Sequence, residues 1–278
     1  MWVDIDPVSK TSDCGKVWEV SKEPDNEFEV RLSIFKGKGV PMEDAEGTSD
    51  VFIKCKIGEN DQQETDTHYR ETNGRPSFNY RLLFNLKTPT KKPFVLTMQA
   101  WDRDLIKSND LICEWQLDIT DMVRDSKITK GPINMQRKYY EESLAQRIRR
   151  EDQPEPLRFC EKESEGNTDS TFILTTFSPD DKKKKKPIDI FLDLRIVPRE
   201  FADMNQVGAA RADPNVEPYL PPPVGRFKLS LNPFAMLNQL CGAALRRKIW
   251  CCICCIFCTL VIYYVFPLIA SFVTIFKK

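Results

Sequence analysis

One uncharged run, from Ile249 to Phe276, limits the fold of this chain more than any other feature. The run reads IWCCICCIFCTLVIYYVFPLIASFVTIF and contains no Asp, Glu, Lys or Arg. At about 1.5 Å of rise per residue, a helix over the whole run would extend about 42 Å, more than the roughly 30 Å of a bilayer's hydrocarbon core. A buried core helix is the alternative, but a soluble domain of this size needs none so long. The run therefore predicts a single transmembrane helix over 249–276.

Only Lys277 and Lys278 follow this run. A span so close to the end predicts a C-terminal anchor that inserts after synthesis. Arg246, Arg247 and Lys248 precede the span, and the larger positive charge on this flank favours a cytosol-facing body. We therefore expect a single-pass protein of a vesicle or plasma membrane.

The chain has 10 cysteines and a single histidine, His68. A cytosolic body keeps its thiols reduced, so the cysteines do not predict a disulfide framework. Five of them lie at the start of the uncharged run, either as small apolar residues of a membrane helix or as sites of S-acylation. These five are Cys251, Cys252, Cys254, Cys255 and Cys258.

Residues 27–197 show the two-residue alternation that is typical of β-strands. In FEVRLSIF, the apolar residues Phe28, Val30, Leu32 and Ile34 share one face. Similar runs recur between loops that are rich in Gly, Pro, Asn and Asp. This arrangement predicts an all-β fold, a C2-like antiparallel β-sandwich of about eight strands. The other runs are 50–58, 79–86, 94–101, 111–119, 171–177 and 188–197.

Three further segments complete the predicted organisation. Residues 1–26 are a polar lead-in without periodicity. An insertion into the sandwich at about 125–170 contains a charged, helix-forming stretch that ends at Pro154. Residues 198–248 include PNVEPYLPPPVG, whose prolines favour stiff, extended backbone. We expect this last segment to be a strap between the sandwich and the anchor.

Two acidic clusters flank predicted loops about fifty residues apart. Asp44 and Asp50 enclose the first loop, and Asp102, Asp104 and Asp110 lie around the second. If both loops meet at one end of the sandwich, five carboxylates without a cation would repel one another. Ca²⁺ accepts six to eight oxygen ligands in irregular geometry, so the clusters predict a calcium site. An EF-hand does not fit the glycine positions; the alternative is that these aspartates are solvated turn residues.

The acidic loops also resemble a known family. DAEGTSDVFIK, from Asp44, and WDRDLIKSNDLI, from Trp101, are similar to the first and third calcium-binding loops of C2 domains. All five acidic ligand positions of that pattern are Asp. Val51 replaces the usual proline after the first loop, and Cys113 replaces the usual glycine after the second.

A more specific resemblance runs from about Glu27 onward. QETDTHYRETNGRPSFNYRLLF, the Pro-rich segment and the terminal span are similar to the C-terminal portion of ferlins. The tandem C2 domains that precede this portion in ferlins are not in the chain. The resemblance implies calcium-dependent phospholipid binding in membrane tethering, vesicle fusion or membrane repair.

Apolar and basic residues beside the acidic loops predict contact with a membrane. Ca²⁺ would cancel the local negative charge, and apolar tips could then enter the headgroup boundary at about 0.8 kcal/mol per buried methylene. Alternatively, the apolar tips pack beneath their loops and the lysine run is solvated. The predicted membrane-contact residues are Val40, Pro41, Met42, Leu105, Ile106, Lys107, Lys182, Lys183, Lys184, Lys185 and Lys186.

Charge and motif content limit the remaining function classes. The 41 basic and 41 acidic residues argue against a general nucleic-acid binder. We expect no enzyme, because no catalytic triad, phosphate loop or acid–base pair stands out. A lipid-modifying enzyme ranks a distant third behind the two binding functions that follow. The favoured hypothesis is a tail-anchored calcium sensor that binds anionic phospholipid membranes, with fusion-machinery or other proteins as candidate partners. The alternative is a calcium-independent, tail-anchored adaptor whose sandwich binds a protein.

Overall fold

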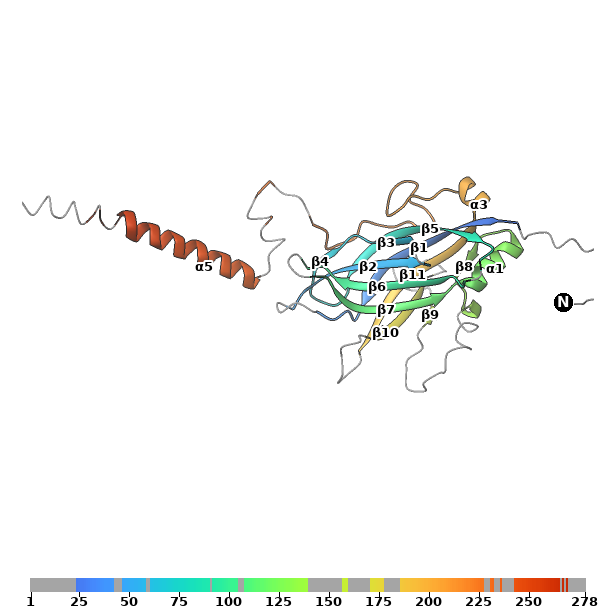
Figure 1. The fold of residues 1–278 in the computed structure, drawn as a ribbon, viewed down its shortest axis with the longest axis horizontal. Helices are drawn as coiled ribbons and strands as arrows, with labels where there is room; N and C mark the ends of the chain where they lie inside the picture. Colours follow the sequence, from blue (N-terminus) through green and yellow to red (C-terminus); the bar gives the residue numbers. More distant parts are fainter. Residues whose placement is uncertain are drawn as a thin grey trace, which may run out of the picture.

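The computed structural model describes residues 24–42, 47–58, 61–90, 92–104, 108–139, 157–159, 171–177, 186–227, 231–232, 236, 243–265, 267 and 269. Within them, two antiparallel sheets pack face to face, as Figure 1 shows. The predicted all-β sandwich is therefore confirmed.

The first sheet, sheet A, has the strand order β5-β1-β11-β10-β9, and β8 also pairs with β11. β1 pairs with the edge strand β5 on one side and with β11, the middle strand of this order, on the other. The strands of sheet A are β1 (Asn26–Lys38), β5 (Ser77–Thr88), β8 (Ile133–Asn134), β9 (Leu157–Phe159), β10 (Phe172–Phe177) and β11 (Pro187–Pro198).

The second sheet, sheet B, has the order β3-β2-β6-β7, and β4 also pairs with β2. Its register places Asp102 opposite Val51 on one side and opposite Asp110 on the other. Both acidic loops therefore open at one end of the sandwich. The strands of sheet B are β2 (Ser49–Ile57), β3 (Asp61–Glu64), β4 (His68–Glu71), β6 (Val95–Asp102) and β7 (Asp110–Asp118).

Alternating apolar residues of the two sheets form the core. Val30, Leu32 and Ile34 of β1 are fully buried, as are Leu96 and Met98 of β6. Burial of such a side chain contributes about 1.5–3 kcal/mol relative to exposure, so the alternation decides which face of each strand turns inward. All seven strands that the alternation predicts are present in the structure.

Among the described elements, four short strands and the helices α1 (Thr120–Thr129) and α3 (Arg199–Met204) were not predicted. β3 reads DQQE and β4 reads HYRE, and neither shows apolar alternation. They form because β2 offers its edge to both, and this edge pairing needs only backbone groups. α1 buries Met122 and Val123. β8 and β9 lie within the predicted insertion, whose helix-forming stretch falls largely outside the described residues.

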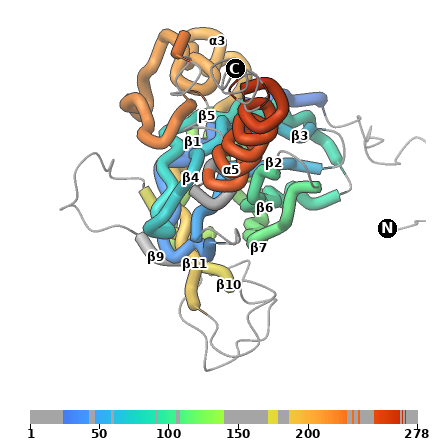
Figure 2. The backbone as a smooth tube through the Cα atoms, turned by 90° about the vertical axis from the view of Figure 1, so that its left-hand side faces the viewer, coloured from blue at the N-terminus to red at the C-terminus, as the bar shows by residue number. Residues whose placement is uncertain are grey.

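After β11 the chain turns back along the sandwich. α3 (Arg199–Met204) follows directly, and residues 205–227 then cross the outer face of sheet A, where Figure 2 shows them over β5 and β1. Ala210 forms a two-bond backbone bridge with Arg81 of β5. Over residues 199–227, the segment that the prolines predict to be a strap is thus attached to the sandwich.

A C-terminal helix contains the first part of the uncharged run. α5 (Ala243–Leu260) continues into a π-helical turn, η2 (Val261–Val265). The stretch Arg247–Val265 has 19 residues and a mean hydropathy of 2.1, none of it buried, so it is long and apolar enough to cross a membrane. The predicted span of 249–276 continues into residues that lie mostly outside the described part of the chain.

Candidate functional site

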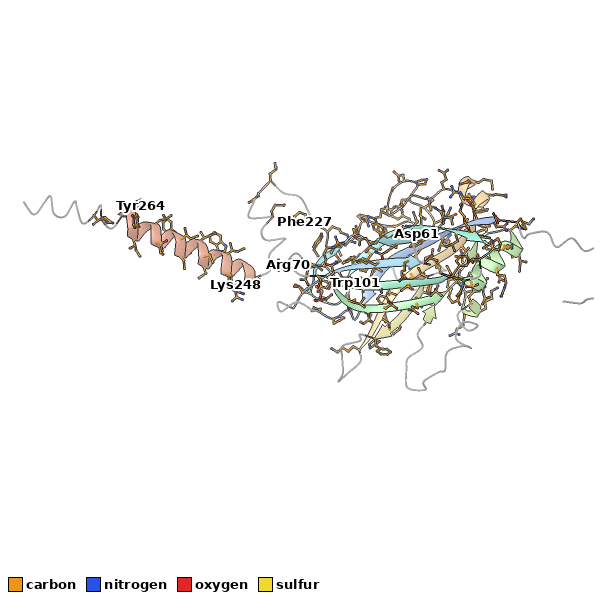
Figure 3. The ribbon with its side chains drawn as sticks, viewed as in Figure 1. Asp61, Arg70, Trp101, Phe227, Lys248 and Tyr264 are labelled. Carbon is orange, nitrogen blue, oxygen red and sulfur yellow. The ribbon has the colours of Figure 1, made fainter. Side chains whose placement is uncertain are left out.

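The two predicted acidic loops meet at one end of the sandwich, which we call the rim. In the described chain the rim comprises residues 39–42, 47–50, 68–76, 102–104, 108–110 and 186–187. The strand registers bring these segments together, because Ser49 pairs with Glu71 and Lys38 pairs with Asp189. Figure 3 shows Arg70 and Trp101 at this end.

Asp50 and Asp102 lie side by side at the rim. The Asp50 amide donates to Asp102 Oδ1 at 2.6 Å, and the Arg70 amide donates to Asp50 Oδ1 at 2.7 Å. The Arg103 amide donates to the Asp50 carbonyl at 2.8 Å. Asp102 is only 4% exposed. Two of these amides therefore orient the carboxylates of two predicted calcium ligands, and the third holds the Asp50 backbone.

The other predicted ligands are less enclosed. Asp104 is half-buried, and its amide donates to Asn109 Oδ1 at 3.2 Å, which closes the turn. Asp110 is exposed, directly opposite Asp102 in the ladder. Asp44 lies outside the described residues. Oxygen donors of this kind suit a hard cation such as Ca²⁺. Among the described residues, however, no three acidic, His or Cys side chains are gathered closely enough to hold a metal ion.

The predicted membrane-contact residues differ in their placement. Val40 packs in the hydrophobic core and is 5% exposed, so its side chain is not at the loop tip. Pro41 and Met42 are half-buried, and the Ser49 hydroxyl donates to the Pro41 carbonyl at 3.3 Å. Lys186 is exposed at the rim. Leu105, Ile106, Lys107 and Lys182–Lys185 lie outside the described residues.

A cluster of cations on aromatic rings borders the rim on the outer face of sheet B. Arg103 lies 4.3 Å from the centroid of Phe52, and Lys54 lies 4.8 Å from that of Trp101. The fully buried Phe52 pairs with Trp101 across the strands but faces away from the core. Alternation along β2 puts Phe52 and Lys54 on one face, but only the β2–β6 register brings Trp101 beside them.

His68, the first residue of the rim segment 68–76, is buried. Its Nδ1 accepts the Ser77 amide at 3.0 Å, so Nε2 carries the proton and donates to Glu71 Oε2 at 2.9 Å. Burial lowers the pKa of His68, and the nearby Glu71 carboxylate partly opposes this shift. These contacts hold the imidazole ring of His68 in one orientation.

Gly225, Arg226 and Phe227 fasten the returning chain to the rim, and we call them the latch. The Gly225 carbonyl accepts the Tyr69 amide at 2.7 Å, and the Phe227 ring meets the Tyr69 ring at 6.1 Å between centroids. Arg226 Nη2 donates to Asp66 at 2.6 Å. The latch was not predicted, because its partners lie far away in the sequence.

Arg81, in the middle of β5, holds the same segment further back. This fully buried guanidinium donates to the carbonyls of Gly208, Val216 and Pro218 at 2.6–2.8 Å. Burial lowers the pKa of Arg81, and the neighbouring guanidinium of Arg31 lowers it further. The three carbonyls are strong local acceptors, so they fix the returning segment on the sheet.

Comparison with known proteins assigns the sandwich to a class of domain. Residues 28–135 match the family model of the C2 domain. Residues 28–135 therefore belong to a C2 domain. The structure of a C2 domain of plant extended synaptotagmin 1 is 14% identical, with a TM-score of 0.35 over 64% of this chain and 98% of that one.

Two proteins that are related in sequence carry ferlin names. Ferlin 1 of Toxoplasma gondii is 29% identical over 206 residues, which cover 72% of this chain and 12% of the relative. Fer-1-like protein 4 of Mus musculus is 30% identical over 157 residues, covering 46% of this chain and 8% of the relative. The chain thus spans about a tenth of the length of these two relatives. The resemblance to the ferlin family is confirmed.

Proposed function

We propose that the rim binds Ca²⁺ and then an anionic phospholipid membrane. The observation that carries this proposal is the contact between Asp50 and Asp102, whose carboxylates are oriented by backbone amides where both acidic loops end. A bound Ca²⁺ would supply positive charge and coordination positions for lipid phosphate oxygens. The residues that would hold it are Asp44, Asp50, Asp102, Asp104 and Asp110.

Side chains around the rim support the membrane part of the proposal. Pro41 and Met42 are half-buried beside the first loop, and the apolar residues Leu105 and Ile106 belong to the second. Lys186, at the end of the lysine run, is exposed at the rim. Each lysine near an anionic surface contributes about 1 kcal/mol of attraction. The rim therefore combines anion-attracting and apolar residues around one candidate cation site.

The C-terminal helix completes the proposed role. Arg247–Val265 would anchor the chain in a vesicle or plasma membrane, with the C2 domain in the cytosol. In this arrangement the protein works by binding rather than by catalysis. Its similarity to ferlins suggests a role in membrane tethering, vesicle fusion or repair, with fusion-machinery proteins as candidate partners.

The test uses the chain ended after Phe227, because every buried residue of the described chain lies between Phe28 and Leu220. This protein is sedimented with phosphatidylserine-containing vesicles, with Ca²⁺ or with a chelator. We expect pelleting that needs Ca²⁺ and is lost in Asp102→Asn/Asp104→Asn. Asp61→Asn/Asp118→Asn removes the same charge at the opposite end of the sandwich and should pellet normally.

Two other outcomes would change the conclusion. Pelleting that ignores both the chelator and the rim variant would assign the membrane contact to the lysine run. No pelleting under any condition would refute the sensor and favour the calcium-independent adaptor. Circular dichroism of each variant confirms that the compared proteins are folded.

A further inference from the structure

After β11 the chain runs back to the rim before it leaves the sandwich. We call the place where it leaves, at Phe227, the exit point. β11 ends at the far end of the sandwich, where Pro198 pairs with Phe28. A chain that left there would leave from the end opposite the acidic loops. Instead, residues 205–227 run back over sheet A, and Figure 3 shows Phe227 near Arg70 at the rim end.

The exit point is separated from the candidate calcium site by one short strand. Tyr69 of β4 donates its amide to Gly225 of the latch, and the next residue, Arg70, donates its amide to Asp50. β4 thus contacts the latch through one residue and a predicted calcium ligand through the next. Any surface that meets the rim also lies close to the point where the chain departs for its anchor.

The latch is held by several specific hydrogen bonds and by close packing. Asp66 receives Arg226 on one oxygen and Arg211 on the other, and both guanidinium groups also donate to the Phe78 carbonyl. Gly225 lies against His68 so closely that a Cβ there would be 2.4 Å from the imidazole ring. The returning segment is therefore held in place up to the latch.

The length of chain beyond the latch decides which membrane the rim can reach easily. The segment 228–242 joins Phe227 to the first residue of α5, Ala243. About 15 residues of chain can span at most about 50 Å. The 12 residues of β11 run the length of the sandwich, which at about 3.3 Å per residue is about 40 Å.

The rim could face either a second membrane or the membrane that holds the anchor. The two lengths make the first orientation much harder to reach than the second. If the rim faced a second membrane, the latch would sit at the side of the sandwich remote from the anchor. The segment 228–242 would then have to run back about 40 Å beside the sandwich, close to its full reach. If the rim faces the anchored membrane, the same segment needs only to join two points near that surface.

We propose that the rim docks on the membrane that holds the chain's own anchor. The inference rests on the proposed calcium-dependent lipid binding and names its target surface: anionic lipid in cis, around α5 with its exposed Arg247 and Lys248. Because the anchor keeps the rim close to this surface, its effective concentration there is high. Cis docking therefore needs less Ca²⁺ than docking on a separate membrane.

The experiment places the full-length chain in one vesicle population and adds protein-free vesicles. Phosphatidylserine is present in only one population at a time. Transfer of energy from tryptophan to a dansyl lipid in the protein vesicles measures cis docking, with Trp101 beside the rim as the responsive donor. Light scattering measures clustering, which reports docking in trans.

With phosphatidylserine in the protein vesicles, we expect a Ca²⁺-dependent rise in energy transfer and no clustering. With phosphatidylserine only in the protein-free vesicles, clustering should need at least about tenfold more Ca²⁺. A variant with 20 Gly/Ser residues inserted after Asn232 releases the length constraint and should cluster vesicles more readily. Its sandwich and acidic loops are unchanged, which makes it the matched control.

Strong clustering at the same Ca²⁺ concentration, unaffected by the insertion, would overturn the cis assignment while leaving the proposed function intact. Asp102→Asn/Asp104→Asn should abolish both signals. If Ca²⁺ changes neither signal in any arrangement, and the chain ended after Phe227 also fails to pellet, the proposed function itself fails. The two failures are thus distinguishable.

Discussion

Replacement of Gly225 by alanine tests whether the latch is a specific contact. Gly225 has a φ of +74°, a left-handed conformation that glycine adopts without penalty. A Cβ at this position would lie 2.4 Å from both Cε1 and Nε2 of His68. The imidazole cannot turn away easily, because Glu71 and Ser77 hold its two nitrogens. We therefore expect Gly225→Ala to displace the latch from β4.

The expected cost follows from the contacts that displacement removes. The Tyr69–Gly225 hydrogen bond contributes about 1 kcal/mol, and the charge-assisted bond from Arg226 to the partly exposed Asp66 about 1–2 kcal/mol. The edge-to-face contact of Tyr69 with Phe227 adds about 0.5 kcal/mol. Gly225→Ala should therefore lower the free energy of unfolding by about 3 kcal/mol.

Urea denaturation of the chain ended after Phe227 measures this loss. Gly58→Ala is the matched control, because Gly58 also has a φ of +74° but no atom lies within 4 Å of its Cβ position. The control isolates the backbone penalty, about 1–2 kcal/mol. Equal losses in the two variants would show that the contact with His68 contributes nothing, and the reasoning about the latch would be refuted.

Three further predictions concern His68, Arg81 and the candidate calcium site. Burial lowers the pKa of His68, so its contribution to stability is present above its ordinary pKa of about 6.5 and is lost as the pH falls through that value. The urea midpoint of the native chain should therefore drop between pH 7.5 and 5.5. The drop should be smaller in His68→Asn. Arg81→Met leaves three carbonyls of the returning segment without their donor, at about 1–3 kcal/mol for each buried carbonyl, and should cost about 3–5 kcal/mol in urea; a loss below about 1 kcal/mol would contradict the anchoring role of Arg81. Ca²⁺ at about 100 times its dissociation constant should stabilise the domain by about 2.7 kcal/mol, which calorimetry would detect as a higher Tm in the native chain and not in Asp102→Asn/Asp104→Asn.

The strands show how far local pattern predicts this fold. Alternation along β1 correctly places Phe28, Val30, Leu32 and Ile34 in the core. The same alternation assigns the opposite face of β1 to solvent, yet Arg31 and Ser33 are buried there as well. The cause is distant in sequence: Arg31 donates to the carbonyl of Asn205, 174 residues away, in the segment that covers this face.

The candidate site also combines features that the sequence predicts with features that depend on distant residues. The acidic spacing predicted ligand positions, and the structure brings Asp50 and Asp102 into contact. Loop composition also predicted that Val40 would contact a membrane, but its side chain is in the core. Whether an apolar residue beside a loop points inward depends on the neighbours that the other segments supply. The Val40 amide, for example, donates to Gly74 of a different loop.

The sequence by itself determined the strand pattern, the acidic loops and the long apolar helix, because each is a property of neighbouring residues. Alternation follows from backbone geometry, and an uncharged run is apolar wherever it lies. Only the tertiary structure decided where the chain leaves the C2 domain. That point depends on pairs such as Arg226 with Asp66, separated by 160 residues, which only the packing of sheet A against the returning segment brings together.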